Sequence, residues 1–167
     1  MLSRNAGSTV AAAAENPLTI GNPALAALYD LWQRKRSGRP APSRADFDLA
    51  DLRPWFGQLM LLDVIDGGRD MRYRLYGTGL VSIFGFDLTG RRVSEVADLI
   101  GTRPLEEYRE VASLMMPAHV SRMSPSAREY LALDKLALPL IDDDGRVNKI
   151  LGAIYLSPVE SKPRNTG

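Results

Sequence analysis

Two groups of strand-like segments, separated by a stretch with helical spacing, limit the folds that this chain can adopt. Residues 59–65 are apolar and partly β-branched, and residues 71–77 alternate apolar with charged side chains. Residues 129–141 and 147–156 have the same strand character, and residues 119–123 are a further short candidate. This order predicts an α+β fold in which one antiparallel sheet of about five strands is covered by helices on one face.

A hairpin turn is predicted within each group of strands. The sequence DGGRD lies between the first two strands, and DDDG lies between the last two. Residues 59–65 are apolar on both faces, whereas residues 71–77 carry one charged face. The earlier strand is therefore expected to lie more centrally in the sheet.

Residues 23–37 carry the signals of an N-terminal amphipathic helix. Asn22 can cap the helix, Pro23 suits its first position, and Gly38 suits the left-handed residue that ends it. Its apolar stripe can pack on the outer face of the sheet or on a twin helix in a homodimer, and we take it as the candidate dimer interface. The stripe consists of Leu25, Leu28, Tyr29 and Trp32.

Further helices are predicted between the two groups of strands. Thr78, Ser94 and Thr102 can each cap the start of a helical segment. Pro117 ends the last segment, because proline cannot continue a helix. The helices that cover the sheet are therefore expected from the middle of the chain.

The overall composition narrows the possible functions. The 167 residues suffice for about one domain, which we place at residues 22–158, with the helix at residues 22–38 and disordered tails at residues 1–21 and 159–167. Twenty-one basic and twenty acidic residues give a net charge of +1, so nucleic acids and anionic membranes are not expected partners. The chain lacks a long apolar segment and contains no cysteine, and we expect a cytoplasmic protein.

Three stretches of the chain resemble a known family. They are PSRADFDLADLRPWFGQLMLLDV, RYRLYGTGLVSIFGFDLTGR and LDKLALPLIDDDGRV, and the likeness covers roughly residues 24–156. The sequence is similar to PAS_5, a family of PAS domains common in alphaproteobacteria. The shared elements are Pro42, Arg44, Asp46 and Asp48 before the first strand, Tyr73, Arg74, Leu75, Gly77 and Thr78 at the end of the second, Thr89, Gly90 and Arg91 after the first midchain helix, and Leu138, Pro139 and Leu140 in a late strand.

The resemblance implies a sensory or regulatory module that binds a small molecule, forms a homodimer or contacts a signalling partner. It implies no reaction. Too few residues remain for a kinase, cyclase or DNA-binding segment, so any output is expected to pass through an interface. The competing hypothesis is a small isomerase or dehydratase with a cone-shaped sheet, although two strands before the main helices do not suit that topology. An interaction scaffold without a ligand is a third possibility.

Several residues of these shared elements also have structural interpretations. Gly77 and Thr78 let a strand turn abruptly into a helix, with glycine supplying a free φ angle and threonine a cap. Arg44 and Arg74 can form a guanidinium clamp with nearby carboxylates such as Asp46, tying the segment before the first strand to the sheet edge. Binding of an anionic ligand by either arginine is the alternative.

An apolar space between the sheet and the midchain helices is the predicted ligand site. Apolar and aromatic side chains of both layers are expected to line it, with a few polar groups among them. The predicted ligand-binding residues are Tyr73, Leu75, Ile83, Phe84, Phe86, Tyr108, Met115, His119, Leu138 and Ile154.

His119 is the single histidine of the chain, and histidine changes charge near neutral pH. A haem ligand, as in some PAS domains, and a general base are alternatives to a pocket contact, but a position just past Pro117 in an apparent loop disfavours haem. Light sensing through a flavin adduct requires a cysteine, which the chain lacks. We therefore predict no cofactor, no metal ligands and no catalytic residues.

Overall fold

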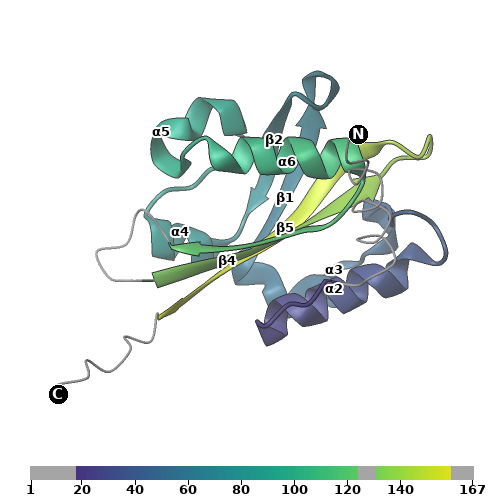
Figure 1. The fold of residues 1–167 in the computed structure, drawn as a ribbon, viewed down its shortest axis with the longest axis horizontal. Coiled ribbons are helices and arrows are strands. Elements are labelled where there is room, and N and C mark those ends of the chain that lie inside the picture. The colour runs from purple at the N-terminus through teal and green to yellow at the C-terminus, as the bar shows by residue number, and fades with distance from the viewer. Residues whose placement is uncertain (1–17, 124–130, 159–167) are drawn as a thin grey trace, which may run out of the picture.

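One antiparallel sheet forms the centre of the molecule (Figure 1). The computed structural model describes residues 18–123 and 131–158. Within them, the strand order is β2-β1-β5-β4-β3, and every neighbouring pair is antiparallel. The strands are β1 (Leu59–Ile65), β2 (Asp70–Tyr76), β3 (Ala118–Met123), β4 (Leu131–Ile141) and β5 (Val147–Pro158).

This sheet confirms the predicted α+β fold. The short segment that begins near His119 is strand β3, and β1 lies between β2 and β5, as its apolar faces predict. Because β1 pairs with β5, the two groups of strands are joined in one sheet. Strands β1 and β2 precede the midchain helices, so the topology is not that of the cone-shaped enzymes.

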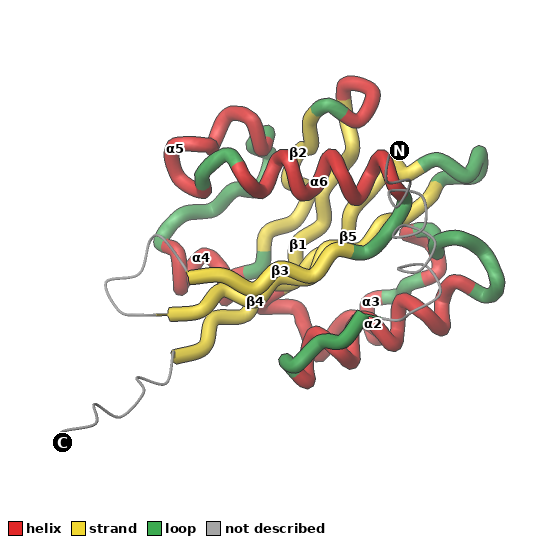
Figure 2. Tube along the Cα trace, viewed as in Figure 1, coloured by secondary structure: helices red, strands yellow, loops and turns green. Residues whose placement is uncertain are grey.

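Helices cover both faces of the sheet, as Figure 2 shows with α6 on one side and α2 on the other. We call the face covered by α4 and α6 the inner face, and the face covered by α2 the outer face. The α-helices are α2 (Pro23–Arg36), α3 (Leu49–Leu52), α4 (Thr78–Phe84), α5 (Ala97–Ile100) and α6 (Arg103–Leu114), and the 3-10 turns are η1 (Arg44–Asp46), η2 (Arg53–Gln58), η3 (Asp66–Gly68) and η4 (Val93–Val96).

Helix α2 begins as the sequence predicts. The Asn22 side chain accepts hydrogen bonds from the backbone N–H groups of Ala24 and Leu25, at 2.9 and 3.1 Å. The helix ends at Arg36, one residue before the predicted end, because Ser37 already adopts a left-handed conformation with φ of 49°.

The predicted N-terminal tail needs a correction at its end. The predicted tail includes residues 18–21, but Leu18 and Ile20 pack against the core of the outer face. The ordered unit therefore begins before the capping residue Asn22. The remainder of that tail and the predicted tail at residues 159–167 lie outside the described residues.

Strand β4 has a core on both sides, which explains its long apolar sequence. Leu136, Leu138 and Leu140 belong to the outer core with α2, while Leu133 and Ala137 belong to the inner core with α6. A strand that is buried on both faces loses the apolar and polar alternation that would mark its inner side. The inner face has to be found from the pairing of the strands.

Candidate functional site

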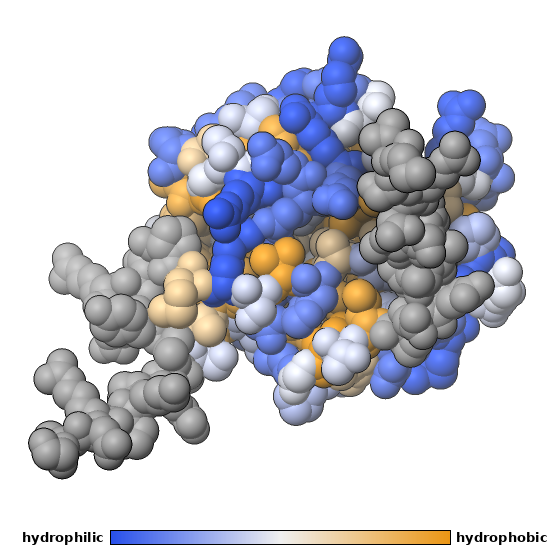
Figure 3. All heavy atoms as spheres, in the orientation of Figure 1, coloured by the Kyte–Doolittle hydropathy of each residue, from blue (hydrophilic) through white to orange (hydrophobic). Residues whose placement is uncertain are grey.

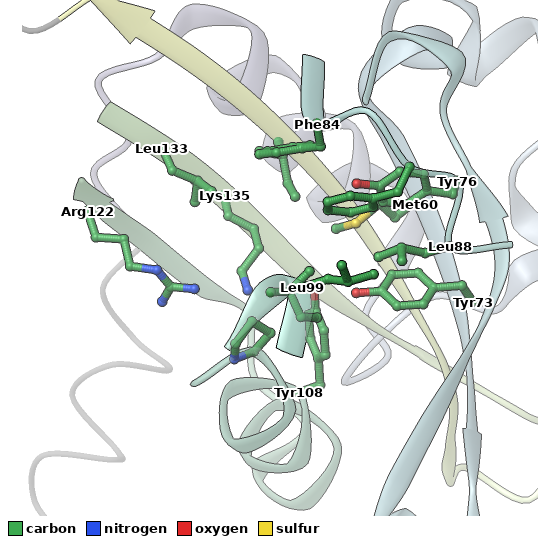
Figure 4. A pocket seen from close by; sticks show the side chains of 14 residues that line it. Met60, Tyr73, Tyr76, Phe84, Leu88, Leu99, Tyr108, Arg122, Leu133 and Lys135 are labelled. Carbon is green, nitrogen blue, oxygen red and sulfur yellow. The ribbon is translucent and has the colours of Figure 1, made fainter. Parts of the chain in front are cut away.

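The inner face holds a cavity between the sheet and the midchain helices (Figure 4). Counted as the space open to the centre of a water molecule, its volume is about 70 Å³. Its walls come from the inner side of all five strands, from helices α4, α5 and α6, and from the loop that follows α4. The lining residues are Met60, Tyr73, Tyr76, Phe84, Phe86, Leu88, Leu99, Ile100, Pro104, Tyr108, Arg122, Leu133, Lys135 and Ile154.

A β-bulge brings two tyrosines into this cavity from one strand. Leu61 pairs with Leu75 and Leu62 pairs with Tyr73, so β2 has one extra residue between these pairs. The extra residue reverses the alternation of β2, and both Tyr73 and Tyr76 point to the inner side. Their rings meet edge to face, with centroids 5.6 Å apart.

The tyrosine hydroxyls of the cavity are neutral donors and acceptors. Burial, with smaller contributions from its contact with Tyr108, raises the pKa of Tyr73 well above its usual 10.0. Burial is also the largest cause that raises the pKa of Tyr76 and of Tyr108. The three phenols therefore remain protonated at neutral pH and are not general bases.

A cluster of three charged side chains lies beside the same cavity. The Lys135 ammonium is 2.6 Å from one carboxylate oxygen of Glu107, and the Arg122 guanidinium donates a hydrogen bond to the other. Lys135 also stands over the ring of Tyr108, 4.5 Å from its centroid. The Lys135 side chain is 3% exposed, compared with about a fifth for Glu107 and for Arg122. We call Glu107, Arg122 and Lys135 the inner charge cluster.

Strand register explains why these residues meet. Arg122 lies opposite Leu133 and two residues from Val120, which lies opposite Lys135, so both cations share the inner side of the β3–β4 pair. Glu107 reaches them from helix α6, which packs over this side. The cluster therefore ties the helix layer to the sheet edge.

The pKa shifts in the inner charge cluster follow from burial and from its pairing. Burial alone would raise the pKa of Glu107, but Lys135 and Arg122 outweigh it and hold that pKa below the usual 4.5. Burial lowers the pKa of Lys135 below 10.5, and the attraction of Glu107 opposes this effect. The ionised carboxylate thus holds two cations at the cavity wall.

Five of the ten predicted ligand-binding residues line the cavity. Figure 4 shows Tyr73, Phe84 and Tyr108 pointing into the space between strands and helices. The five are Tyr73, Phe84, Phe86, Tyr108 and Ile154.

Three predicted lining residues point elsewhere. Leu138 is fully buried, but on the outer face, because it lies opposite Leu151 of the outer core. Leu75 is 43% exposed, since the bulge turns it away from the inner side. Ile83 is 47% exposed on helix α4. None of these three side chains therefore lines the inner cavity.

Met115 and His119 are also placed away from the cavity. Met115 ends helix α6 in a left-handed conformation, with φ of 53°, and packs against the outer core. His119 lies opposite Leu136, on the outer side of β3, and its imidazole Nε2 is hydrogen-bonded to the carboxylate of Asp134. Neither residue therefore lines the inner cavity.

The predicted clamp of Arg44 and Arg74 is not formed. Arg44 donates to the backbone oxygen of Phe47 at 2.7 Å, and Arg74 donates to Asp63 at 2.8 Å. The carboxylate of Asp46 instead accepts a hydrogen bond of 2.6 Å from Arg39. The chain turns tightly between Arg39 and Asp46, so Arg39 binds this carboxylate and no residue of the sheet is needed.

Gly77 and Thr78 form the abrupt strand-to-helix connection that the sequence predicts, by a different mechanism. Gly77 has φ of −59°, which any residue can adopt, but an added Cβ would overlap the backbone oxygen of Gly57. Thr78 is the first residue of helix α4 and does not cap it through its side chain. The glycine is required for close approach of two backbone segments, and not for a positive φ.

The stripe proposed as a dimer interface is part of the core of the chain. Leu25, Leu28, Tyr29 and Trp32 are at most 8% exposed and pack against the outer face. Trp32 Nε1 also donates a hydrogen bond of 2.9 Å to the Pro139 oxygen. The face seen in Figure 3 carries both hydrophilic and hydrophobic groups. The structure thus selects packing on the outer face for these side chains, and a dimer interface built from them is incorrect.

The inner charge cluster is the main feature that the sequence analysis missed. Lys135 stands in an apolar strand, and a charged residue there indicates a special environment. Its period-2 relation to Leu133 and Ala137 puts it on the same side of β4 as these two residues, but only the strand pairing shows that this is the inner side. The partners Glu107 and Arg122 carry no comparable signal, because charged residues on a helix and on an edge strand are common.

The cofactors considered for this fold do not suit the residues present. His119 does not line the cavity, so it is not placed to ligate a haem there. A volume of about 70 Å³ is far below the roughly 300 Å³ at which pockets for drug-sized ligands begin. Residues 18–123 and 131–158 bring together no group of three His, Cys, Asp or Glu side chains that could hold a metal ion.

The chain is similar to known proteins in sequence and in structure. The family model described as PAS_5, a PAS domain, matches residues 20–155. A sensory box sensor histidine kinase from Vibrio cholerae has a TM-score of 0.51 and 12% identity over 67% of this chain and 90% of that chain. The PAS domain of BvgS from Bordetella pertussis has a TM-score of 0.48 and 18% identity, over 62% of this chain and 79% of that chain. No curated protein matches the sequence.

In the part of the chain that the structure describes, no helix has the length and apolar character to cross a membrane.

Proposed function

Because this chain belongs to the PAS domain family, as a PAS_5 domain, we propose that it is a sensory or regulatory module that binds a small molecule in the inner cavity. The bound molecule acts on a homodimer contact or on a signalling partner. No reaction is included in this proposal. PAS domains typically serve as sensory or signalling modules, and the proposal adds where a ligand binds in this one.

The inner cavity is the observation that supports this proposal. Its walls combine Tyr73 of β2, Phe84 of α4, Tyr108 of α6 and Ile154 of β5, so a ligand would touch the sheet and the helices at once. A ligand changes a conformational equilibrium only by binding one arrangement more tightly than another. A site between two layers supports that role, because any shift of the helices against the sheet changes its shape.

The charges around the cavity support binding more than catalysis. Glu107 is held as a carboxylate by two cations, and burial raises the pKa values of the tyrosines. A general acid or base works best when its pKa lies near the working pH. The groups at this site are displaced from that range, which supports a recognition site.

Native mass spectrometry of the purified protein tests the ligand. We expect an added mass that is released on denaturation and is absent from the Ile154→Phe variant, in which the larger ring occupies the cavity. A chain that carries no added mass, and whose NMR spectrum does not respond to a small-molecule library, would contradict ligand binding and favour an interaction scaffold.

Light scattering tests the homodimer. A concentration-dependent mass of two chains supports it, and a monomer at high concentration contradicts it. Because the α2 stripe is buried, Trp32→Ala is unsuitable as a test of this contact. Crosslinking between exposed positions of the full chain identifies the surface that is used.

A further inference from the structure

The charged groups that line the cavity have one sign. Arg122 and Lys135 are the charged residues among the described residues of its wall. Both pair with Glu107, which stands beside the wall on helix α6. Two cations share one carboxylate, so the inner charge cluster has one net positive charge.

Burial makes this excess positive charge energetically costly. Removing a cation from water is costly unless it is paired and hydrogen-bonded. The Lys135 side chain is 3% exposed, and its single carboxylate partner is shared with Arg122. Each cation still has N–H groups beyond the contact that it makes with Glu107, since lysine has three donors and arginine five. A further acceptor in the cavity would satisfy them.

A second cluster also has one carboxylate between two cations, but its cations are more exposed, so this arrangement of charges does not require burial. Asp63 is paired with Lys149 at 2.5 Å and with Arg74 at 2.8 Å, on the outer side of β1, β5 and β2. Lys149 is 22% exposed and Arg74 is 62% exposed. Neither cation lines the inner cavity. We call these three residues the outer charge cluster, and its cations can take a second partner from water.

We propose that the inner cavity binds a small monocarboxylic acid as its anion, with the carboxylate at Lys135 and Arg122 and the apolar part among the aromatic side chains. This inference rests on the proposed function and names the chemical class of its ligand. A monoanion matches the single net positive charge. The guanidinium of Arg122 has the planar geometry that suits a carboxylate.

The other walls define the rest of the molecule. Tyr76, Phe84 and Phe86 offer apolar surface, and Phe84 and Phe86 stack with centroids 6.0 Å apart. A cavity of about 70 Å³ is about half of the roughly 150 Å³ that holds benzene, so it accommodates a short chain and not a ring or a long acyl chain. The expected ligand is therefore an aliphatic acid of a few carbons.

Isothermal titration calorimetry with two matched pairs of probes tests the inference. The pairs are butanoate with butanamide, and benzoate with benzamide, because each amide keeps the shape of its acid and removes the charge. We expect butanoate to bind the full chain more than about tenfold tighter than butanamide, the factor that one charge-assisted hydrogen bond supplies. Benzoate should bind more weakly than butanoate, because its ring exceeds the cavity. The NMR signals that shift should belong to the cavity wall.

Variants assign the effect to the inner charge cluster. Lys135→Met keeps the length of the side chain and should weaken the binding of the acid about tenfold or more, with little effect on the amide. Arg122→Gln is the second variant, in case Lys135→Met does not fold. Lys149→Met removes the matching cation of the outer charge cluster and should leave the affinity within about twofold of the wild type.

The outcomes separate the inference from the proposed function. Acid and amide binding equally in the cavity would overturn the preference for an anion and retain a small-molecule site. An acid that binds the Lys135→Met and Arg122→Gln variants as tightly as the wild type would also overturn it. Absence of binding by all four probes would overturn the inference, while the added mass in native mass spectrometry tests the proposed function separately.

Discussion

Both faces of the sheet carry one carboxylate between two cations, but the two faces differ in what surrounds these charges. On the outer face, helix α2 fills the space over the sheet, and the cluster of Asp63 lies toward solvent at the side of this packing. On the inner face, the cluster of Glu107 lies at the wall of a cavity, with Lys135 almost fully buried. The same three charges are a surface ion pair network in one place and a candidate recognition site in the other.

The difference shows that the packing around a charge cluster decides whether its charges face solvent or a cavity. Helix α2 covers the outer face with large apolar side chains such as Trp32, and the outer charge cluster lies at the edge of this packing. The inner face is covered by shorter elements, α4 and α5, and by the single longer helix α6, and these leave a gap. If this comparison is correct, substitutions on the two faces should have different effects on stability and on binding.

The largest effect is expected from removing the main side chain that closes the outer face. Trp32→Ala should lower the free energy of unfolding by about 3–5 kcal/mol, because it leaves a cavity in a dense core and removes the hydrogen bond to Pro139. Urea unfolding followed by circular dichroism measures the change. Leu99→Ala, at a 41% exposed residue of the inner cavity, is the control and should cost under about 1 kcal/mol. Equal losses would refute the contrast between the faces.

The second effect compares the two carboxylates. Glu107→Gln leaves the buried Lys135 without its anion and should cost about 2 kcal/mol, below the value for a fully buried pair because Glu107 is partly exposed. Asp63→Asn removes the carboxylate of the more exposed cluster and should cost under about 1 kcal/mol. Chemical denaturation at neutral pH measures both. A larger loss for Asp63→Asn would mean that burial does not distinguish the two clusters.

The pH dependence of stability sharpens the same comparison. The pairing with Lys135 and Arg122 holds the folded-state pKa of Glu107 below 4.5, so the ionised carboxylate stabilises the fold above about pH 4.5. That contribution is lost as the pH falls through the folded-state pKa. The gap in unfolding free energy between wild type and Glu107→Gln should therefore be constant at neutral pH and should shrink below pH 4.5. A gap that stays constant down to pH 2 would contradict this role.

The order of elements could be predicted from the sequence because it depends on local signals. Asn22 and Pro23 mark a helix start, and alternating side chains mark the strands, so the fold follows from short segments. The side of each residue in the sheet was harder to predict. Leu138 was placed on the wrong face, because β4 is apolar on both sides and its period gives no direction.

The site could be predicted only in part, because its polar members depend on contacts between distant elements. Tyr73 and Tyr108 were identified from their apolar neighbours, whereas the meeting of Glu107 with Lys135 requires the register of β3 with β4 and the position of α6. The bulge that exposes Leu75 is equally invisible in the sequence. Long-range pairing, and not residue type, decides these positions.

The smallest effect is expected where the inner face has room for a larger side chain. Ile154→Phe places a ring at the wall of a cavity of about 70 Å³, and we expect the free energy of unfolding to change by under about 1 kcal/mol. Leu151→Phe adds similar bulk to the outer core, where Leu151 is 1% exposed, and should cost about 1–3 kcal/mol because the packing has no space to give. Thermal unfolding by calorimetry compares the two variants of β5. Equal costs would mean that the inner cavity is as tightly packed as the outer core, and the site argued from it would lose its physical basis.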